Sequence, residues 1–361
     1  MKNKSILTVI LLCVTVYLSA QEKEKSTLTI SGYAEVYYQQ DFNNPVDNKR
    51  PSFVYSHNRN NEFNINLAFI KAAYNTERLR TNIAMATGTY MNTNYSAETD
   101  VIKNIYEANV GFKLSKKHNL WIDAGLMPSH IGFERAIGRD NWTLTRSLFA
   151  DNSPYFETGA KISYTSESTM WFISGMILNG WQRVQRVNGN STPAFGHQII
   201  FKPNAKWIFN SSSFIGNDKA DSVRQMRYFH NLYAIYQMND KIGLTTGFDI
   251  GAEQKSKGSS AYNTWFTPVL IAKYTANQKL ALTGRAEYYQ DKKGVIIATG
   301  TSNGFQAVGL SLNIDYNILP NLMWRTEIRN LNNGNDAIFI DRDNSLKRNS
   351  TTATSALAVS F

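Results

Sequence analysis

Hydrophobic and polar residues alternate along most of this chain, from Leu28 to its last residue. In the first such segment, Leu28–Gln39, the even positions from Leu28 to Tyr38 carry mainly apolar side chains, whereas the odd positions include Glu35. A period of two residues is typical of a β-strand whose two faces meet different surroundings. The pattern therefore predicts an all-β chain.

The same alternation predicts further strands, although not all of them are equally clean. In Glu62–Tyr74, Phe63, Ile65, Leu67 and Phe69 are predicted to share the apolar face. In Ile105–Leu114 that face begins with Tyr106. Two later segments, residues 170–178 and 265–274, are apolar on both faces.

The connections between the predicted strands are alternately short and long. Seven short and eight long connections would join about sixteen strands, with both chain ends on the side of the short turns. This sorting of loop lengths is typical of outer-membrane barrels, whose two rims face different compartments. We therefore predict a single antiparallel transmembrane β-barrel, wide enough at this strand number to hold an aqueous channel.

The two ends of the chain fit an exported barrel. Lys2 and Lys4 precede the apolar stretch 6–18, which predicts a signal peptide over residues 1–20, cleaved to leave a barrel domain over 21–361. The only cysteine, Cys13, lies in that leader. The last predicted strand, 351–361, must pair with the first because an open edge in lipid leaves backbone groups unpaired. Its terminal Phe361 is typical of the signal read by barrel-assembly machinery.

Composition narrows the choice further. Aromatic residues make up 12% of the chain and its mean hydropathy is −0.36, which fits strands that expose every second side chain to lipid. The formal net charge of +10 could indicate nucleic-acid binding, but the leader and the scattered basic residues argue against it. We expect no nucleic-acid partner.

The region from Asp123 to Tyr164 resembles the OmpL-like β-barrel porin-2 family. The matching motifs in this region are Ala124-Gly125-Leu126-Met127-Pro128, Ile131-Gly132-Phe133-Glu134, Thr145-Arg146-Ser147 and Ser153-Pro154-Tyr155-Phe156-Glu157-Thr158-Gly159. The later Leu178-Asn179-Gly180-Trp181 is also similar to that family, and so is the overall plan of the mature chain. The resemblance implies an outer-membrane barrel with pore activity. It implies no substrate and no binding residues.

The long connection 128–156 is the candidate for a pore constriction, because mixed charges in a loop that folds into a barrel create a field across the pore. The candidate residues are Glu134, Arg135, Arg139, Asp140 and Arg146. Alternatively, these charges pair with one another on the outer surface.

Charged residues on the polar faces of strands are predicted to face water, since a midplane Arg or Lys in hydrocarbon costs about 2–4 kcal/mol. The predicted lumen charges are Arg78, Arg80, Lys161, Arg285, Glu287, Arg325, Glu327 and Arg329.

No motif of a hydrolase, nucleotide-binding protein or metalloprotease is present, and the five histidines lack ligand spacing. We therefore predict no enzyme, no catalytic residue, no metal and no cofactor. The predicted function is passive diffusion of small hydrophilic solutes, with a preference for anions. The alternative is a surface-exposed binding or adhesion protein anchored by a barrel. Expected partners are outer-membrane lipid and lipopolysaccharide, the barrel-assembly machinery, the solutes and, in a homotrimer, two further copies.

Overall fold

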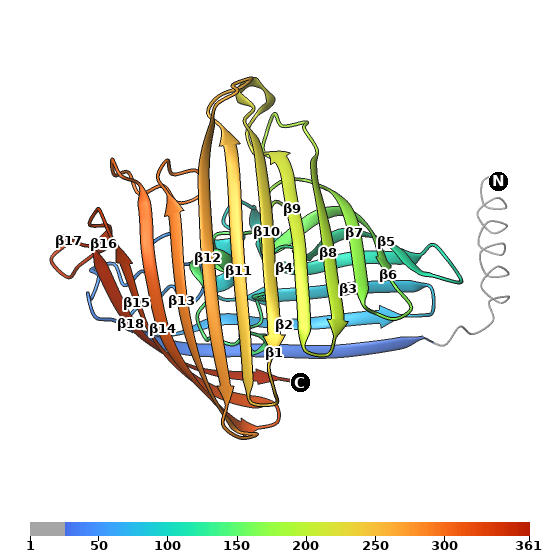
Figure 1. The fold of residues 1–361 in the computed structure, drawn as a ribbon, viewed down its shortest axis with the longest axis horizontal. Coiled ribbons are helices and arrows are strands. Elements are labelled where there is room, and N and C mark those ends of the chain that lie inside the picture. Colours follow the sequence, from blue (N-terminus) through green and yellow to red (C-terminus); the bar gives the residue numbers. More distant parts are fainter. Residues whose placement is uncertain (1–25) are drawn as a thin grey trace, which may run out of the picture.

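Residues 26–361 form one closed antiparallel β-barrel in the computed structural model (Figure 1). The prediction of a single barrel of about sixteen strands is confirmed, because sixteen strands follow one another around the ring in chain order. The predicted signal peptide, residues 1–20, lies outside the described residues. Within residues 26–361 no helix has the length and apolarity needed to cross a membrane.

The barrel strands are β1 (Thr27–Asp41), β2 (Phe63–Asn75), β3 (Leu79–Thr87), β4 (Ile105–Lys113), β5 (Asn119–Pro128), β6 (Phe156–Thr165), β7 (Trp171–Leu178), β8 (Ala194–Asn204), β9 (Trp207–Asn217), β10 (Met226–Gln237), β11 (Ile242–Gln254), β12 (Tyr262–Thr275), β13 (Leu280–Asp291), β14 (Phe305–Leu319), β15 (Leu322–Asn333) and β18 (Asn349–Ser360). The connections hold the short helices α2 (Thr89–Asn94) and α3 (Leu148–Asp151), the 3-10 turns η1 (Asp100–Asn104), η2 (Gly138–Asp140) and η3 (Asp221–Val223), and the two-stranded sheet β16 (Phe339–Ile340) and β17 (Leu346–Lys347).

The ring closes between the first and last strands. β1 pairs with β18 in antiparallel register from Tyr33 opposite Ser360 to Asp41 opposite Thr352. Beyond that register the Gly32 N–H donates to the Phe361 carbonyl at 2.9 Å, and the Phe361 N–H donates to the Gly32 carbonyl at 3.0 Å. Every barrel strand thus has two neighbours, so the sheet has no open edge.

The two faces of the wall differ in the way that the alternation predicts. On β14, for example, Leu310 and Leu312 are 58% and 68% exposed on the outside, whereas Ser311 and Asn313 are buried inside. A belt of exposed apolar side chains on the outer face is what a hydrocarbon surrounding requires.

Two β-bulges correct the predicted faces of β2 and β4. The register of β1 and β2 shifts between Glu35 and Val36, so Leu67 and Phe69 turn inward instead of sharing a face with Phe63. A second shift, opposite Ala84, turns Tyr106 inward, where its ring stacks on that of Phe69 at 5.3 Å. A bulge adds one residue to one strand and reverses the alternation beyond it, which a sequence pattern read alone does not reveal.

The barrel interior is partly filled by connections between the strands. Residues 42–62, here called L1, and residues 129–155, here called L3, both place apolar side chains against the inner wall. Phe53 of L1 and Leu148 of L3 belong to one buried cluster with Trp265 and Phe305 of the wall. Strands β7 and β12 supply inward apolar residues such as Met176 and Val269, which explains why their segments are apolar on both faces.

Candidate functional site: the lumen and the loop inside it

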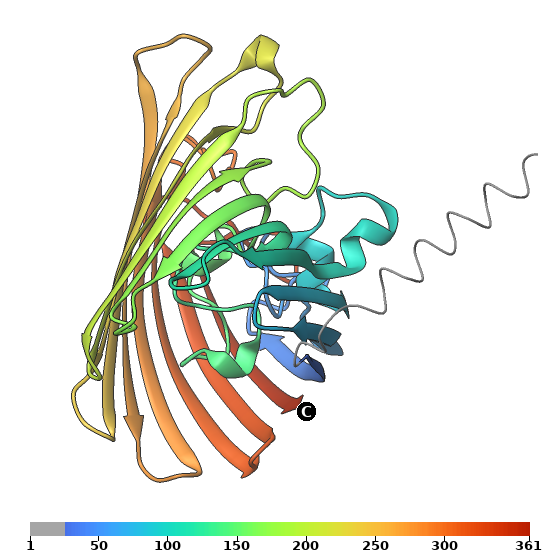
Figure 2. The same cartoon turned by 90° about the vertical axis from the view of Figure 1, so that its right-hand side faces the viewer.

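L3 lies inside the ring of strands rather than over its rim. Figure 2 looks toward the barrel opening and shows this connection, coloured green, within the wall. Nearly all of residues 141–155 are buried. The loop lies against the strands from β10 to β15, where its backbone finds hydrogen-bond partners on several inward side chains.

The predicted lumen charges of β13 and β15 bind this loop. Arg285 donates to the Thr145 carbonyl at 2.6 Å and to the Glu327 carboxylate at 2.9 Å. Glu327 and Glu287 accept from the backbone N–H groups of Thr145 and Leu148, at 2.6 and 2.5 Å. These charged groups point inward, but L3 covers them, and each is at most 4% exposed.

The remaining two predicted lumen charges of this wall are similarly paired and buried. Arg325 binds Asp315 through two nitrogens and donates to the carbonyls of Gly138 and Asn141 in L3, at 2.5 and 2.9 Å. Arg329 donates to Glu287 at 2.7 Å. The wall that carries L3 is therefore close to electrically neutral.

Of the predicted constriction residues, Arg146 and Glu134 hold the shape of L3. Arg146 is fully buried and donates to the carbonyls of Arg135, Leu144 and Ala136 at 2.8, 2.7 and 2.9 Å. Glu134 accepts hydrogen bonds from the backbone and hydroxyl of Ser147. Neither side chain reaches water in this structure, so a role in ion selectivity rests on the other three residues.

Arg135 and Asp140 are exposed toward the lumen, and both line a cavity of about 170 Å³ between L3 and the inward ring of Tyr106. Arg139 is half-buried and reaches the rim of the short turns, where it donates to the Ser360 hydroxyl at 2.7 Å and to the Pro320 carbonyl. L3 thus runs from the long-loop side of the barrel almost to the opposite rim.

The facing wall, β2 to β6, carries ionisable side chains that L3 does not bury. Lys71 pairs with Glu107 at 2.6 Å and Arg80 with Asp123 at 2.6 Å, and both cations remain about one-third exposed. Lys161 and Lys113 are half-buried and have no acidic partner within residues 26–361. This wall therefore keeps a surplus of positive charge.

One predicted lumen residue lies elsewhere. Arg78 belongs to the turn before β3, and its guanidinium lies 4.8 Å from the ring centroid of Phe112, an outward side chain that is 44% exposed. The residue is at the barrel rim because the strand begins only at Leu79.

Sequence reasoning missed Lys71 and Asp123. For Lys71 the reason is the β2 bulge, which reverses the face that the alternation gave it. Because exposing a lysine to hydrocarbon costs free energy, the residue type alone could have indicated that Lys71 faces water.

Burial shifts the pKa values of ionisable groups in L3. It raises the pKa of Glu134 and, against the opposing charges of Arg329 and Arg146, raises the pKa of Asp151 to about 7. It also lowers the pKa of His130 to about 4, so this imidazole is neutral at pH 7. Asp151 is of interest because its carboxyl group contacts Ser56 of L1 at 3.5 Å and so links the two inner loops.

We expect the contact between L1 and L3 to weaken as the pH rises from 4 to above 7. When the pKa of an aspartate is higher in the folded than in the unfolded chain, the folded form is stabilised while the carboxyl group is protonated. This stabilisation of the folded form is lost as the pH rises from the unfolded-state pKa to the folded-state pKa. At about 1.4 kcal/mol per pH unit this amounts to a few kcal/mol. Single-channel conductance should rise between pH 5 and pH 8.5 as L1 loosens, and Asp151→Asn should abolish that rise. An identical pH profile in the variant would contradict the assignment.

Among residues 26–361, no three His, Cys, Asp or Glu side chains are grouped so as to hold a metal ion. His197 and His230 lie together on the outer face, with ring centroids 5.8 Å apart, and bond to Ser213 and Ser211 rather than to an acidic group.

Comparisons with known proteins agree with this architecture. A family profile described as "Putative beta-barrel porin-2, OmpL-like" matches residues 27–361. No curated protein matches the chain. Similar solved structures include an anion-selective porin from Comamonas acidovorans, with a TM-score of 0.62, 9% identity, and coverage of 93% of this chain and 100% of that one.

Two other structures show the same likeness of fold. The outer membrane protein OmpT of Vibrio cholerae, in its trimer form, has a TM-score of 0.60 at 9% identity and covers 94% of this chain and 100% of its own. The outer membrane channel DcaP of Acinetobacter baumannii has a TM-score of 0.57 at 11% identity and covers 94% and 99%.

Proposed function

This chain belongs to the OmpL-like beta-barrel porin-2 family, and from that premise we propose that it is a water-filled channel for passive diffusion of small hydrophilic solutes, with a preference for anions. The protein is a porin-type barrel of the outer membrane of Gram-negative bacteria, and its family and fold indicate a channel rather than an enzyme.

The observation that carries the anion preference is the asymmetry between the two inner walls. Under L3 the cations Arg285, Arg325 and Arg329 are matched by buried carboxylates. On the open side Lys113 and Lys161 have no such partner within the described residues. A surplus of fixed positive charge raises the local concentration of anions and lowers that of cations.

Single-channel recording in planar bilayers tests the channel itself. The purified full-length protein should conduct in discrete steps. A barrel that inserts but never conducts would contradict the proposal and favour the barrel-anchored binding or adhesion protein.

The charge asymmetry has its own test. Lys113→Gln with Lys161→Gln removes two cations without leaving a paired carboxylate alone. Since a unit charge about 4 Å away acts on an ion with about 1 kcal/mol in water, we expect the anion-to-cation permeability ratio to fall by up to about five-fold per charge. The reversal potential in a KCl gradient measures this ratio. A matched variant, Lys292→Gln with Lys293→Gln, neutralises two exposed lysines of a long connection and should keep the wild-type value.

Four further assignments belong to the proposal. These are a cleaved leader over residues 1–20, recognition of Phe361 by the barrel-assembly machinery, contact of the long-loop rim with lipopolysaccharide, and assembly as a homotrimer. The trimer is supported by the likeness to a barrel whose structure is a trimer form.

A further inference from the structure

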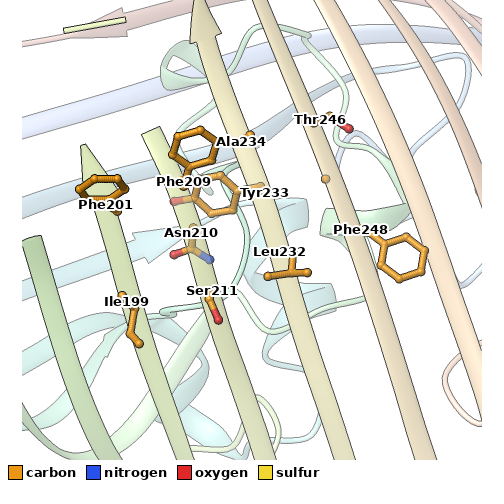
Figure 3. A pocket seen from close by; sticks show the side chains of 11 residues that line it. Ile199, Phe201, Phe209, Asn210, Ser211, Leu232, Tyr233, Ala234, Thr246 and Phe248 are labelled. Atoms are coloured by element: carbon orange, nitrogen blue, oxygen red, sulfur yellow. The ribbon is translucent and has the colours of Figure 1, made fainter. Parts of the chain in front are cut away.

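The outer surface of β8 to β11 contains a hollow of about 440 Å³ in the lipid-facing belt (Figure 3). Its floor consists of small side chains on neighbouring strands, Ser211, Ala234 and Thr246. Ala234 pairs with Phe209 on one side and with Thr246 on the other. The small side chains of Ala234 and Thr246 therefore leave space beside the ring of Phe209. Figure 3 shows Phe209 and Phe248 on opposite sides of this floor. The volume lies within the range of roughly 300–1,000 Å³ found for ligand sites.

One end of the hollow lies near the rim of the short turns. Phe209 is the third residue of β9, and Phe201 lies near the end of β8, so both flank the two-residue turn that joins these strands. At this rim the rings of Trp171 and Phe201 stack at 4.2 Å, and those of Trp207 and Tyr236 stack at 4.1 Å. Tryptophan and tyrosine gather where hydrocarbon meets headgroups, which places this end of the hollow at headgroup depth.

Positive charge is concentrated directly at the same rim. Lys206 lies in the turn between β8 and β9, and Lys202 lies near the end of β8, two residues before the strand ends at Asn204. Lys241 lies in the next short turn, before β11. All three are exposed, and the acidic residue among these turns is Asp240. A surface of this kind, apolar in the membrane and basic at the headgroups, complements a molecule with an apolar chain and an anionic head.

We propose that this face is a binding site for an anionic phospholipid of the leaflet at the short turns. An acyl chain lies in the hollow over Ser211, Ala234 and Thr246, and the phosphate contacts Lys202, Lys206 and Lys241. In outer-membrane barrels the short turns face the periplasm, so the lipid comes from the periplasmic leaflet. The site lies on the outside of the wall and is independent of solute passage.

The test uses the full-length barrel, purified in detergent, depleted of lipid and mixed with equal amounts of phosphatidylglycerol and phosphatidylcholine that carry the same acyl chains. Native mass spectrometry counts the lipids retained. We expect preferential retention of phosphatidylglycerol. Lys202→Gln, Lys206→Gln and Lys241→Gln together should weaken this retention by roughly five-fold per lysine. Ala234→Phe, which fills the hollow but keeps the lysines, should weaken it as well.

The matched control is Lys116→Gln, Lys117→Gln and Lys279→Gln, three exposed lysines at short turns elsewhere on the same rim. It should retain phosphatidylglycerol like the wild type. Equal retention of both lipids by the wild type, or equal losses in the two triple variants, would overturn the proposal. Dimers that Ala234→Phe disperses would instead assign the hollow to a second copy of the chain.

Discussion

Alanine at Gly125 or Gly159 is expected to prevent the barrel from closing around β4 to β7. The two glycines face each other across β5 and β6, where L3 leaves the wall. A Cβ on Gly125 would lie 2.2 Å from the Ala108 carbonyl oxygen, and one on Gly159 would lie 2.0 Å from the Ile177 carbonyl oxygen. These neighbours are backbone atoms of adjacent strands, so the strands themselves would have to move.

Gly125 carries an additional cost because its φ is +125°, a conformation that L-residues rarely adopt. Strain of this kind costs roughly 1–3 kcal/mol, and overpacking costs about as much again. We expect either variant to lose most of its folded form in a thermal melt followed by circular dichroism and by heat-modifiable gel mobility.

The matched control is Gly175→Ala on β7. A Cβ at this glycine meets no atom within 4 Å, so the variant should melt with the wild type. If all three variants behave alike, close backbone approach is not the reason for glycine at positions 125 and 159.

The glycine pair also gives a physical reason for two of the motifs that carry the family resemblance. Gly125 belongs to Ala124-Gly125-Leu126-Met127-Pro128, and Gly159 ends the motif that begins at Ser153. Both motifs lie at the base of L3, one on each side. They therefore mark the two places where L3 joins the wall and where the backbone of a neighbouring strand leaves no room for a Cβ.

The strands and their order were predictable because each is a local pattern. The alternation over Leu28–Gln39 matches β1. The alternation of short and long connections matches the order in which the sixteen strands follow one another around the barrel. Alternation along one segment does not show the offset that a bulge introduces, since the extra residue of β2 becomes apparent only from its pairing with β1. Leu67 and Phe69 were therefore assigned to the wrong face.

The candidate site was only partly predictable, for a similar reason. Sequence identified the loop and the inward direction of Arg285 and Glu327, both of which follow from charge and period. It did not show that L3 packs on those side chains, because this contact joins residues more than 130 positions apart. The apolar inner faces of β7 and β12 were the available signal, since a water-filled lumen does not need Met176 or Trp265.

Arg146→Ala is expected to release L3 from its folded shape and to raise single-channel conductance. The variant removes three hydrogen bonds from a fully buried guanidinium and leaves the carbonyls of Arg135, Ala136 and Leu144 without their partner. Leaving a buried hydrogen-bond acceptor without its partner costs about 1–3 kcal/mol, and three carbonyls lose their partner here. The loss destabilises the folded shape of L3 rather than the strands, because Arg146 makes no hydrogen bond to a strand in the described residues.

The neighbouring Arg135→Ala provides the control for this prediction. Arg135 is exposed, and its side chain makes no hydrogen bond or ion pair within residues 26–361, although its backbone belongs to the same network. We expect Arg135→Ala to keep the wild-type conductance and to lower anion preference, whereas Arg146→Ala changes the conductance itself. Melting of the barrel should be similar in both, since the sixteen-stranded ring closes without the loop. If conductance stays unchanged in Arg146→Ala, L3 does not limit the pore, and the narrowest part of the channel lies elsewhere in the lumen.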